Sequence, residues 1–317
     1  MISAFAPATV ANVAVGFDIL GFALDNAGEI CTAEKNEDNK KIIINPIDGY
    51  PDLNLNPKFN TAGRGLIEMQ KDFKLNFGFK LTLKKNIPLG SGLGGSATSA
   101  CAAVLAASYF LPRKLRIEEL IHYALIGEEV ASGSRHADNV APCLNGGMCF
   151  VKSSSPIITL PIKIPSKLRV VVILPDLSIK TKDARSILSP TVPLKTVINQ
   201  TTNLVGTILS LQQNKLDQLK YFFQDVMIEP QRSKLIPHFT TYQKICLDHG
   251  ALGFSLSGSG PAMFTLTSSE DSATLIIKKL ISWNIKNKVK CKAIWSSSIS
   301  RQGAHIIKDT KKIAKIK

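Results

Sequence analysis

Four glycines within six residues form the part of this sequence best suited to binding a ligand. Gly90, Gly92, Gly94 and Gly95 are followed directly by a run of small and apolar residues. Glycine reaches positive φ angles without a Cβ clash and lets backbone N–H groups approach a ligand closely. Because the free amides at the start of a helix attract anions, this pattern predicts a phosphate-binding loop.

The residues on either side of the glycines predict the elements that hold the loop. Residues 79–84 alternate apolar and polar side chains, as a half-buried strand does. After the loop, small and apolar residues from Ala97 to Leu111 predict a buried helix, and Ser96 can cap its N-terminus. We therefore expect a strand, a glycine loop and a helix in that order.

Three known kinds of glycine-rich turn are candidates for this loop. A P-loop ends in Gly-Lys followed by Ser or Thr, and the sequence contains no Gly-Lys pair. Gly90, Gly92 and Gly95 match the dinucleotide pattern G-x-G-x-x-G, but that pattern requires a second strand, and residues 115–130 have a helical pattern instead. The third alternative, a tight turn that binds no ligand, stays open.

Two acids end the next predicted helix, residues 117–131. Glu128 and Glu129 lie in its last turn, where the negative end of the helix dipole repels carboxylates. Since this arrangement is locally unfavourable, it indicates a compensating cation nearby.

The segment from Pro88 to Ala97 resembles the phosphate-binding motif of the GHMP kinases, which phosphorylate small molecules with ATP. The usual motif has two serines after Leu-Gly. Here Gly95 replaces the first, which leaves Ser96 as the hydroxyl available to a metal ion. The resemblance implies ATP and Mg²⁺ as cofactors.

Two further segments match motifs of the same family. Residues 128–139 resemble its Glu-x-x-x-Ser-Gly-x-x-His-x-Asp-Asn motif, whose acid binds Mg²⁺, so that Glu128 and Ser96 are the implied metal ligands. Residues 253–266 resemble a third motif, a hairpin whose glycines pack close to the phosphate loop. The implied nucleotide-binding residues are Asn60, Lys85, Pro88, Leu89, Gly90, Ser91, Gly92, Leu93, Gly94, Gly95, Ser96, Ala97 and Thr98.

Two of these nucleotide contacts could instead have ordinary structural roles. The family residue that matches Asn60 lies near the adenine, but Asn60 also precedes a predicted helix and can serve as its N-cap. Lys85 could reach a phosphate, although a lysine at the end of a strand is commonly solvated. Both alternatives stay open.

The N-terminal segment, residues 7–21, resembles the signature of the branch of the family that phosphorylates homoserine, Pro-Ala-Thr-x-Ala-Asn followed by Gly-Phe-Asp-x-x-Gly. The resemblance implies that Asp18 pairs with the substrate ammonium and that Arg185 and Arg232 bind its carboxylate, which suits the fork of an arginine. The full set of implied substrate residues is Asn12, Asp18, His136, Asn139, Arg185 and Arg232.

Asn139 stands where many GHMP kinases have a catalytic aspartate, and it is expected to position the substrate hydroxyl by hydrogen bonding. The implied catalytic residues are Asn139, Arg185, Ser96 and Glu128. The residues alone favour another role for Asn12, the hydrogen bonding of buried backbone groups, and would place either arginine on the surface.

The fold implied by the resemblance is α+β with two domains. Residues 1–155 would form a βαβ-containing nucleotide-binding domain and residues 156–300 a ferredoxin-like α/β sandwich, with 301–317 as a basic tail. The implied function is ATP-dependent phosphorylation of the L-homoserine side-chain hydroxyl in threonine biosynthesis, by an enzyme that is a homodimer by family analogy. The alternatives are a mevalonate-like kinase and a non-catalytic nucleic-acid-binding protein on the same scaffold.

Composition agrees with a cytoplasmic globular protein. The 317 residues contain no apolar run long enough to span a membrane and no signal peptide, and the six cysteines show no metal-site spacing. Residues 278–317 carry a net charge of +11 out of +15 for the chain. We expect this basic region to be a solvated surface with no part in catalysis, and we expect no nucleic-acid partner.

Overall fold

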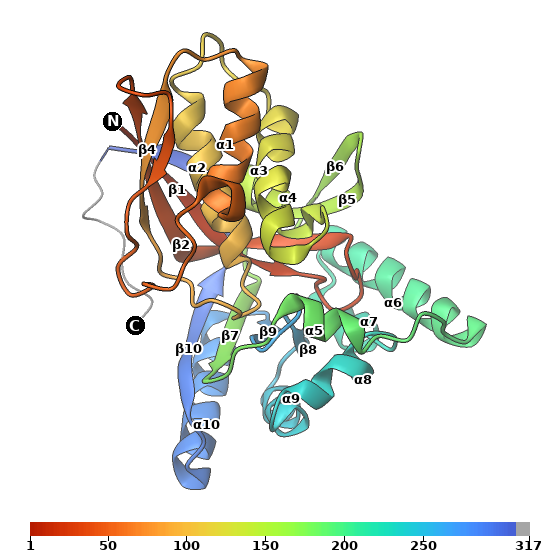
Figure 1. Cartoon of the computed structure of the whole chain (residues 1–317). Helices are drawn as coiled ribbons and strands as arrows, with labels where there is room; N and C mark the ends of the chain where they lie inside the picture. The colour runs from red at the N-terminus through yellow and green to blue at the C-terminus, as the bar shows by residue number, and fades with distance from the viewer. Residues whose placement is uncertain (309–317) are drawn as a thin grey trace.

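Two β-sheets organise the chain, and the computed structural model describes residues 1–308 (Figure 1). In that part of the chain the first sheet has seven strands, with the order β11-β1-β2-β4-β3 and with β5 and β6 continuing from β2. Its strands are β1 (Ile2–Ala11), β2 (Leu20–Asn36), β3 (Ile42–Ile44), β4 (Gly78–Lys84), β5 (Met148–Ser154), β6 (Ile157–Ile162) and β11 (His305–Ile307). All pairs are antiparallel except β3 with β4.

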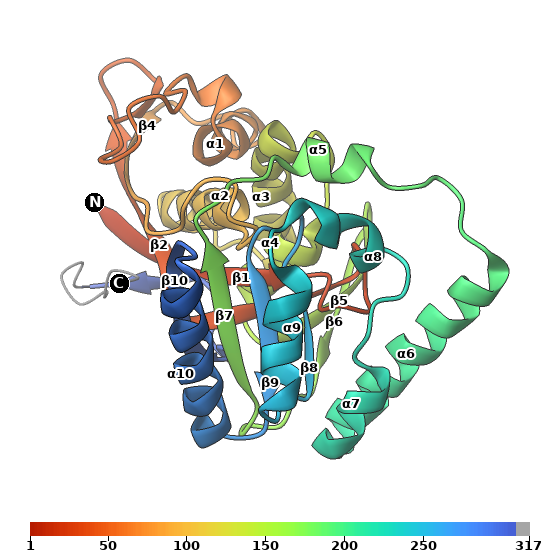
Figure 2. The same ribbon diagram turned by 90° about the horizontal axis from the view of Figure 1, so that it is seen from below.

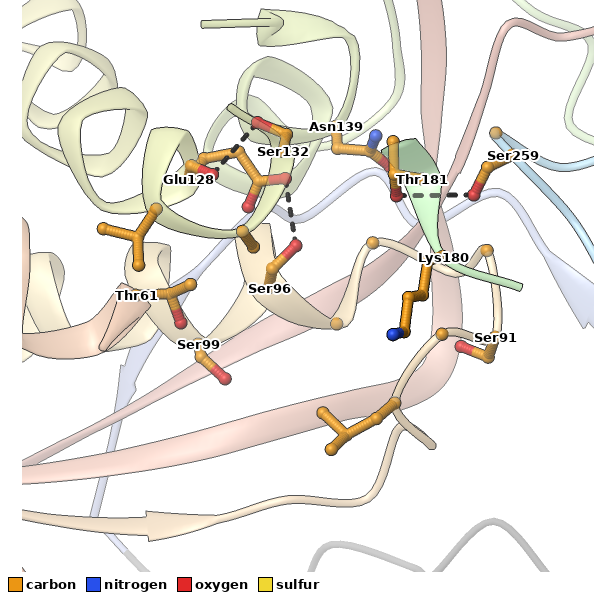
Figure 3. A pocket seen from close by; sticks show the side chains of 18 of the residues that line it. Thr61, Ser91, Ser96, Ser99, Glu128, Ser132, Asn139, Lys180, Thr181 and Ser259 are labelled. Atoms are coloured by element: carbon orange, nitrogen blue, oxygen red, sulfur yellow. Dashed lines mark hydrogen bonds between the residues drawn. The ribbon is translucent and has the colours of Figure 1, made fainter. Parts of the chain in front are cut away.

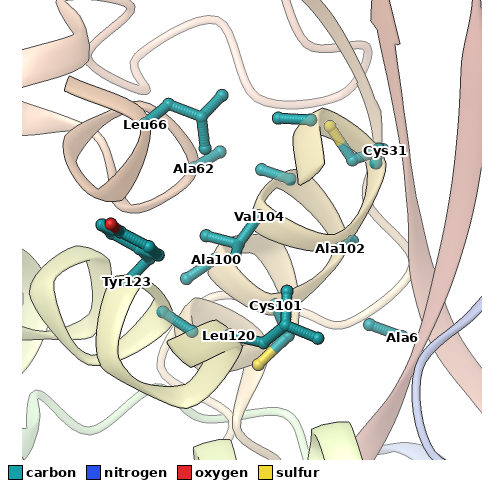
Figure 4. Packing of buried hydrophobic residues seen from close by; sticks show 14 of the residues in the cluster. Ala6, Cys31, Ala62, Leu66, Ala100, Cys101, Ala102, Val104, Leu120 and Tyr123 are labelled. Carbon is teal, nitrogen blue, oxygen red and sulfur yellow. The ribbon is translucent and has the colours of Figure 1, made fainter. Parts of the chain in front are cut away.

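Four helices pack against the first sheet: α1 (Thr61–Asp72), α2 (Gly95–Ser108), α3 (Ile117–Ser132) and α4 (Ala137–Asn145). The central one is α2, which is buried on all sides because its residues are small. Figure 4 shows Ala100, Ala102 and Val104 of α2 between α1 and α3 on one side and the sheet on the other. This close packing fixes the position of the helix start, where the glycine loop ends.

The second sheet is antiparallel, with the order β10-β7-β9-β8. Its strands are β7 (Arg169–Pro175), β8 (Gly253–Leu256), β9 (Met263–Thr267) and β10 (Cys291–Ser298). Helices α9 (Phe239–Asp248) and α10 (Glu270–Asn287) cover one face, as Figure 2 shows. The other face packs on the first sheet, where the rings of Phe22 and Phe264 lie 5.8 Å apart.

Shorter elements complete this half of the chain. The helices are α5 (Thr181–Ser186), α6 (Leu194–Gln212), α7 (Leu219–Phe222) and α8 (Glu229–Arg232), and the 3₁₀ turns are η1 (Pro57–Phe59), η2 (Leu216–Gln218) and η3 (Ser233–Leu235). Within residues 1–308, no helix is both long and apolar enough to cross a membrane. The predicted α+β class is confirmed, and so are the strand before the glycine loop and the long helix after it.

The prediction that Ser96 caps α2 is wrong. The helix starts at Gly95 after Gly94, whose φ of 68° is left-handed, and Ser96 lies inside the first turn with its hydroxyl turned to Glu128. No side chain caps the backbone amides of the first turn, so these amides can donate hydrogen bonds to an anion.

The predicted domain limits fall inside the first sheet. The expected boundary after residue 155 lies in the turn between β5 and β6, which pair with each other. Within the expected basic tail, β11 pairs with β1. The remainder of that tail, residues 309–317, lies outside the described residues.

Candidate active site

A cavity of about 620 Å³ lies where the glycine loop, α3, α4 and the segment before α5 meet. It is lined by all of the residues that the sequence assigns to nucleotide, metal and substrate except Leu93, Ala97 and Thr98, which are buried beneath it. Figure 3 shows Ser91 and Ser96 on one wall, Glu128 and Asn139 on another, and Lys180 beside the loop.

The glycine loop needs its glycines for two reasons. Gly90, Gly92 and Gly94 have φ angles of 64°, 81° and 68°. A Cβ on Gly92 would lie 2.6 Å from the carbonyl oxygen of Ser257, because the β8–β9 hairpin packs on the loop. The predicted approach of this hairpin to the loop is confirmed, and the Ser257 hydroxyl donates a hydrogen bond to the Gly92 carbonyl at 2.7 Å.

Ser96 and Glu128 meet at the start of α2. The Ser96 hydroxyl lies 2.9 Å from Glu128 Oε1, whereas Oε2 is buried and has no hydrogen-bond partner among residues 1–308. Burial raises the pKa of Glu128 to about 8, although the Ser96 hydrogen bond opposes this shift. An unpartnered buried carboxylate oxygen beside a hydroxyl fits a cation.

This carboxylate would be the one acidic side chain in a metal site. The described residues contain no group of three or more His, Cys, Asp or Glu side chains that could enclose a metal ion. Mg²⁺ commonly uses one or two carboxylates and completes its octahedron with phosphates and water. The donor set of Ser96 and Glu128 therefore fits Mg²⁺ that arrives with a nucleotide.

Lys85 is buried rather than solvated, and its partner Glu29 was missed from the sequence. Lys85 Nζ lies 2.8 Å from Glu29 Oε1 and 2.8 Å from the Ser99 hydroxyl. Burial raises the pKa of Glu29, and Lys85 opposes that shift. The signal in the sequence was an acid in the apolar strand that follows residue 20.

Asn60 performs the N-cap role, one of the two that its position in the sequence allowed. Its Oδ1 accepts a hydrogen bond from the Ala62 amide at 2.9 Å, and its Nδ2 donates to the carbonyl of Asn54 at 2.7 Å. The same residue lies on the cavity wall.

The other end of the cavity holds the predicted substrate residues. Arg185 Nη2 lies 2.8 Å from both carboxylate oxygens of Asp18, and His136 Nδ1 lies 3.6 Å from Asp18 Oδ2. Burial lowers the pKa of His136, whose Nε2 has no hydrogen-bond partner in the described part of the chain. The Phe17 ring lies 5.3 Å from the Arg185 guanidinium and 5.0 Å from that of Arg232.

Arg232 is only 3% exposed, so the surface position that the residues alone favoured is wrong for it. Its Nε donates to the Ala184 carbonyl at 3.0 Å and its Nη1 to the Gly258 carbonyl at 2.9 Å. These bonds hold the guanidinium at the cavity wall and stabilise the fold around α5.

Asn12 has the backbone role that its apolar surroundings suggested. Its Nδ2 donates to the Gly258 carbonyl at 2.9 Å, and its Oδ1 accepts from the Asp18 amide at 3.1 Å. Asn12 therefore fixes the backbone at Asp18, whose φ is 62°.

Two residues that the sequence did not single out lie around Asn139. Asp138 is 4% exposed, and burial together with the charge of Asp18 raises its pKa to about 7. Thr9 on β1 donates a hydrogen bond from its hydroxyl to Asn139 Oδ1 at 2.7 Å. Both residues stand within motifs matched above, but nothing in the sequence showed which neighbours they contact.

Comparisons with known proteins agree on one family. Residues 60–147 match the GHMP kinases N terminal domain and residues 202–286 match the GHMP kinases C terminal domain. The chain is 40% identical to the homoserine kinase of Xylella fastidiosa strain M12 over 271 residues, which cover 85% of this chain and 83% of the relative. It is 37% identical to the homoserine kinase of Chlorobaculum tepidum over 320 residues, with 98% and 99% coverage.

A solved structure extends this agreement to the arrangement in space. The crystal structure of homoserine kinase from Cytophaga hutchinsonii has a TM-score of 0.92 and 38% sequence identity with this chain, and the match covers 96% of this chain and 97% of that one. This chain therefore belongs to the GHMP kinase family and, within it, to the homoserine kinases.

Proposed function

We propose that this protein transfers the γ-phosphoryl group of ATP to the side-chain hydroxyl of L-homoserine, giving O-phospho-L-homoserine and ADP for threonine biosynthesis. The observation that carries the proposal is the meeting, in one cavity, of a loop suited to phosphate with side chains suited to both ends of an amino acid. The Asn139 amide also lines this cavity, next to Gly94 of the loop.

At the nucleotide end, the free amides of the glycine loop and of the first turn of α2 would hold the phosphates. Ser96 and Glu128 would hold Mg²⁺, which neutralises charge on the phosphoryl group when it is bound. Phosphoryl transfer passes through a loose transition state, so positioning and charge neutralisation supply most of the catalysis.

At the substrate end, Asp18 and Arg185 form an ion pair. The ammonium of homoserine would pair with Asp18. The carboxylate of homoserine would accept hydrogen bonds from Arg185 and from the donors of Arg232 that do not bond to the backbone. Because the substrate carries both charges, it would replace the protein's own ion pair without leaving either partner unpaired. His136, with its unpartnered Nε2, adds a further polar contact at this end.

Two alternatives are weaker. A mevalonate-like kinase would not need Asp18 to face an ammonium, and this chain is 37–40% identical to the homoserine kinases above over most of its length. A nucleic-acid-binding protein would not need a buried, unpartnered Glu128 oxygen beside the phosphate loop. We further propose a cytoplasmic location, since all six cysteines are free thiols. The homodimer remains a prediction from the family resemblance.

The proposed activity is tested by measuring ADP release with a panel of hydroxyl substrates and identifying the products by mass spectrometry. We expect Mg²⁺- and ATP-dependent conversion of L-homoserine to its O-phosphate and no turnover of mevalonate, which has a carboxylate but no ammonium for Asp18. Turnover of mevalonate in preference to homoserine would place the chain in another branch of the family. ATP binding without any turnover would support a non-catalytic role.

A further inference from the structure

Thr9 lies at a junction of three elements of the active site. It belongs to β1 and is completely buried. Its backbone amide donates to the carbonyl of Leu93 in the glycine loop at 3.2 Å, and its hydroxyl donates to Asn139 Oδ1 in α4 at 2.7 Å. One residue therefore bonds both to the loop suited to phosphate and to the amide proposed to position the substrate hydroxyl.

The backbone of Thr9 is available for this because Thr9 faces Ala23 of β2 in a pair without mutual hydrogen bonds. The Ala23 amide donates to the Gly147 carbonyl, and the Ala23 carbonyl accepts from the Ser300 amide. The Thr9 amide therefore points away from β2, toward the glycine loop.

The absence of a side chain at Gly94 makes the contact possible. A Cβ on Gly94 would lie 2.1 Å from Thr9 Oγ1 and 2.8 Å from Asn139 Oδ1. The hydrogen bond between Thr9 and Asn139 thus passes directly over Gly94, the residue before the first turn of α2. Because Gly94, Thr9 and Asn139 are in such close contact, a displacement of the loop would also displace the Asn139 amide.

The hydrogen bond from Thr9 also determines which atom of the Asn139 amide faces the cavity. A buried hydroxyl must donate its hydrogen to an acceptor, and among the described residues the acceptor of Thr9 is Asn139 Oδ1. If the amide were turned over, its NH₂ group would meet the hydroxyl and that hydrogen would lose its acceptor. The Nδ2 group is therefore the one left to donate a hydrogen bond into the cavity.

We propose that Thr9 is a positioning residue of the phosphoryl transfer. It holds the Asn139 oxygen so that the Asn139 NH₂ group donates to an oxygen at the reaction centre, either the attacking hydroxyl or the phosphoryl group. In this orientation Asn139 cannot accept the proton of the substrate hydroxyl. The proposal rests on the proposed homoserine kinase activity and adds a residue that reaches the reactants only through Asn139.

The test compares Thr9→Val, which keeps the shape and removes the hydroxyl, with Thr9→Ser, which keeps the hydroxyl. We expect kcat to fall roughly 10- to 100-fold in Thr9→Val, with the KM values for ATP and homoserine within about threefold of wild type. Thr9→Ser should recover kcat to within about threefold. Thr265→Val is the matched control, since Thr265 is an equally buried threonine whose hydroxyl donates to the Gly253 carbonyl, outside the cavity.

A double-mutant cycle separates positioning from a general structural effect. Since Thr9 acts through Asn139, Thr9→Val should have little effect on kcat in an Asn139→Ala background. An equal loss in both backgrounds, or an unchanged kcat in Thr9→Val, would overturn the proposal. If Thr9→Val does not fold, Thr9→Ala is tested in the same cycle with the same expectation. A wild-type enzyme that does not phosphorylate homoserine would instead refute the proposed function.

Discussion

The Asp18 carboxylate is held by the Arg185 guanidinium, with Arg185 Nη2 at 2.8 Å from each of its oxygens. The two residues are 167 positions apart in the chain, and both line the cavity. Both are partly exposed, at 27% and 41% of their side chains, so that the pair is open to exchange with a ligand. An amino acid carries the two charges needed to replace both members of this pair.

Glu128→Gln tests the metal site. The variant keeps the size of the side chain but replaces the carboxylate oxygen that would bind Mg²⁺, so kcat should fall on the order of 10³-fold, equivalent to about 4 kcal/mol of transition-state stabilisation. Glu129→Gln is the matched control, because Glu129 is the next residue and its carboxylate forms a surface ion pair with Arg135. Thermal unfolding should show that both variants fold. Normal turnover of Glu128→Gln at saturating Mg²⁺ would show that Glu128 has a structural role only.

The basic C-terminal region is expected to have no part in catalysis. A chain that ends after Lys308 should keep kcat/KM for both substrates within about threefold of wild type, a difference below roughly 1 kcal/mol. Truncation after Ser300 would also affect the folded core, although the sequence places it before a basic tail. It removes β11 from the edge of the first sheet, and it removes the hydrogen bond from the Ala304 amide to the Cys143 carbonyl. We expect that shorter chain to have a lower Tm. A large loss of kcat/KM in the longer chain, measured while it remains folded, would contradict this view.

Ionisation of the buried Glu229 carboxyl should lower the free energy of unfolding as the pH rises. Burial raises its pKa to about 7 from a usual value near 4.5, and its carboxylate accepts a hydrogen bond from Ser255. Between these two values the unfolded chain is ionised and the folded chain is protonated, so unfolding releases a proton. The free energy of unfolding therefore falls with rising pH across this window, by on the order of 2–3 kcal/mol.

The contribution of Glu229 is measured against Glu229→Gln by urea unfolding at pH 5 and pH 8. The decrease between these pH values should be smaller in the variant by the amount given above. Glu270→Gln is the control, since Glu270 is an exposed acid paired with Arg169. Identical pH dependence in wild type and Glu229→Gln would mean that Glu229 ionises normally in the folded protein.

Local patterns in the sequence predicted the elements that carry the site. Glycines at the loop and alternating side chains before it depend on residues within a few positions of each other, and the structure confirms the strand, the loop and α2. Local patterns also predict one helix over residues 216–227, but the structure has only η2 and α7 there, and α7 ends at Phe222. The Asp225 carboxylate accepts hydrogen bonds from the amides of residues 227–229, which fixes a turn before α8 in place of further helix.

The sequence pattern over residues 235–249 also predicts a helix, and the observed helix starts later for an equally local reason. Ile236 precedes Pro237 and is extended, with φ at −113°, so α9 begins only at Phe239. This signal was present in the sequence.

Contacts between distant segments could not be predicted. Glu29 and Lys85 are 56 positions apart and Thr9 and Asn139 are 130 apart, so no spacing rule joins them. The family resemblance supplied residues for the site but not the hydrogen bonds that orient them. Those follow only from the pairing of β1 with β2 and the packing of α2 and α4 on the sheet.

Recognition of both ends of the amino acid is tested most directly by comparing L-homoserine with homoserinol. Homoserinol keeps the ammonium and the reacting hydroxyl but lacks the carboxylate. With homoserinol bound, Asp18 would pair with the ammonium and leave the guanidiniums of Arg185 and Arg232 without an anion. We predict that kcat/KM favours homoserine by roughly 10²- to 10⁴-fold. Arg185→Gln should shrink this ratio and leave the KM for ATP nearly unchanged. Equal kcat/KM for the two compounds in the wild-type enzyme would contradict the claim that the site recognises both ends of an amino acid.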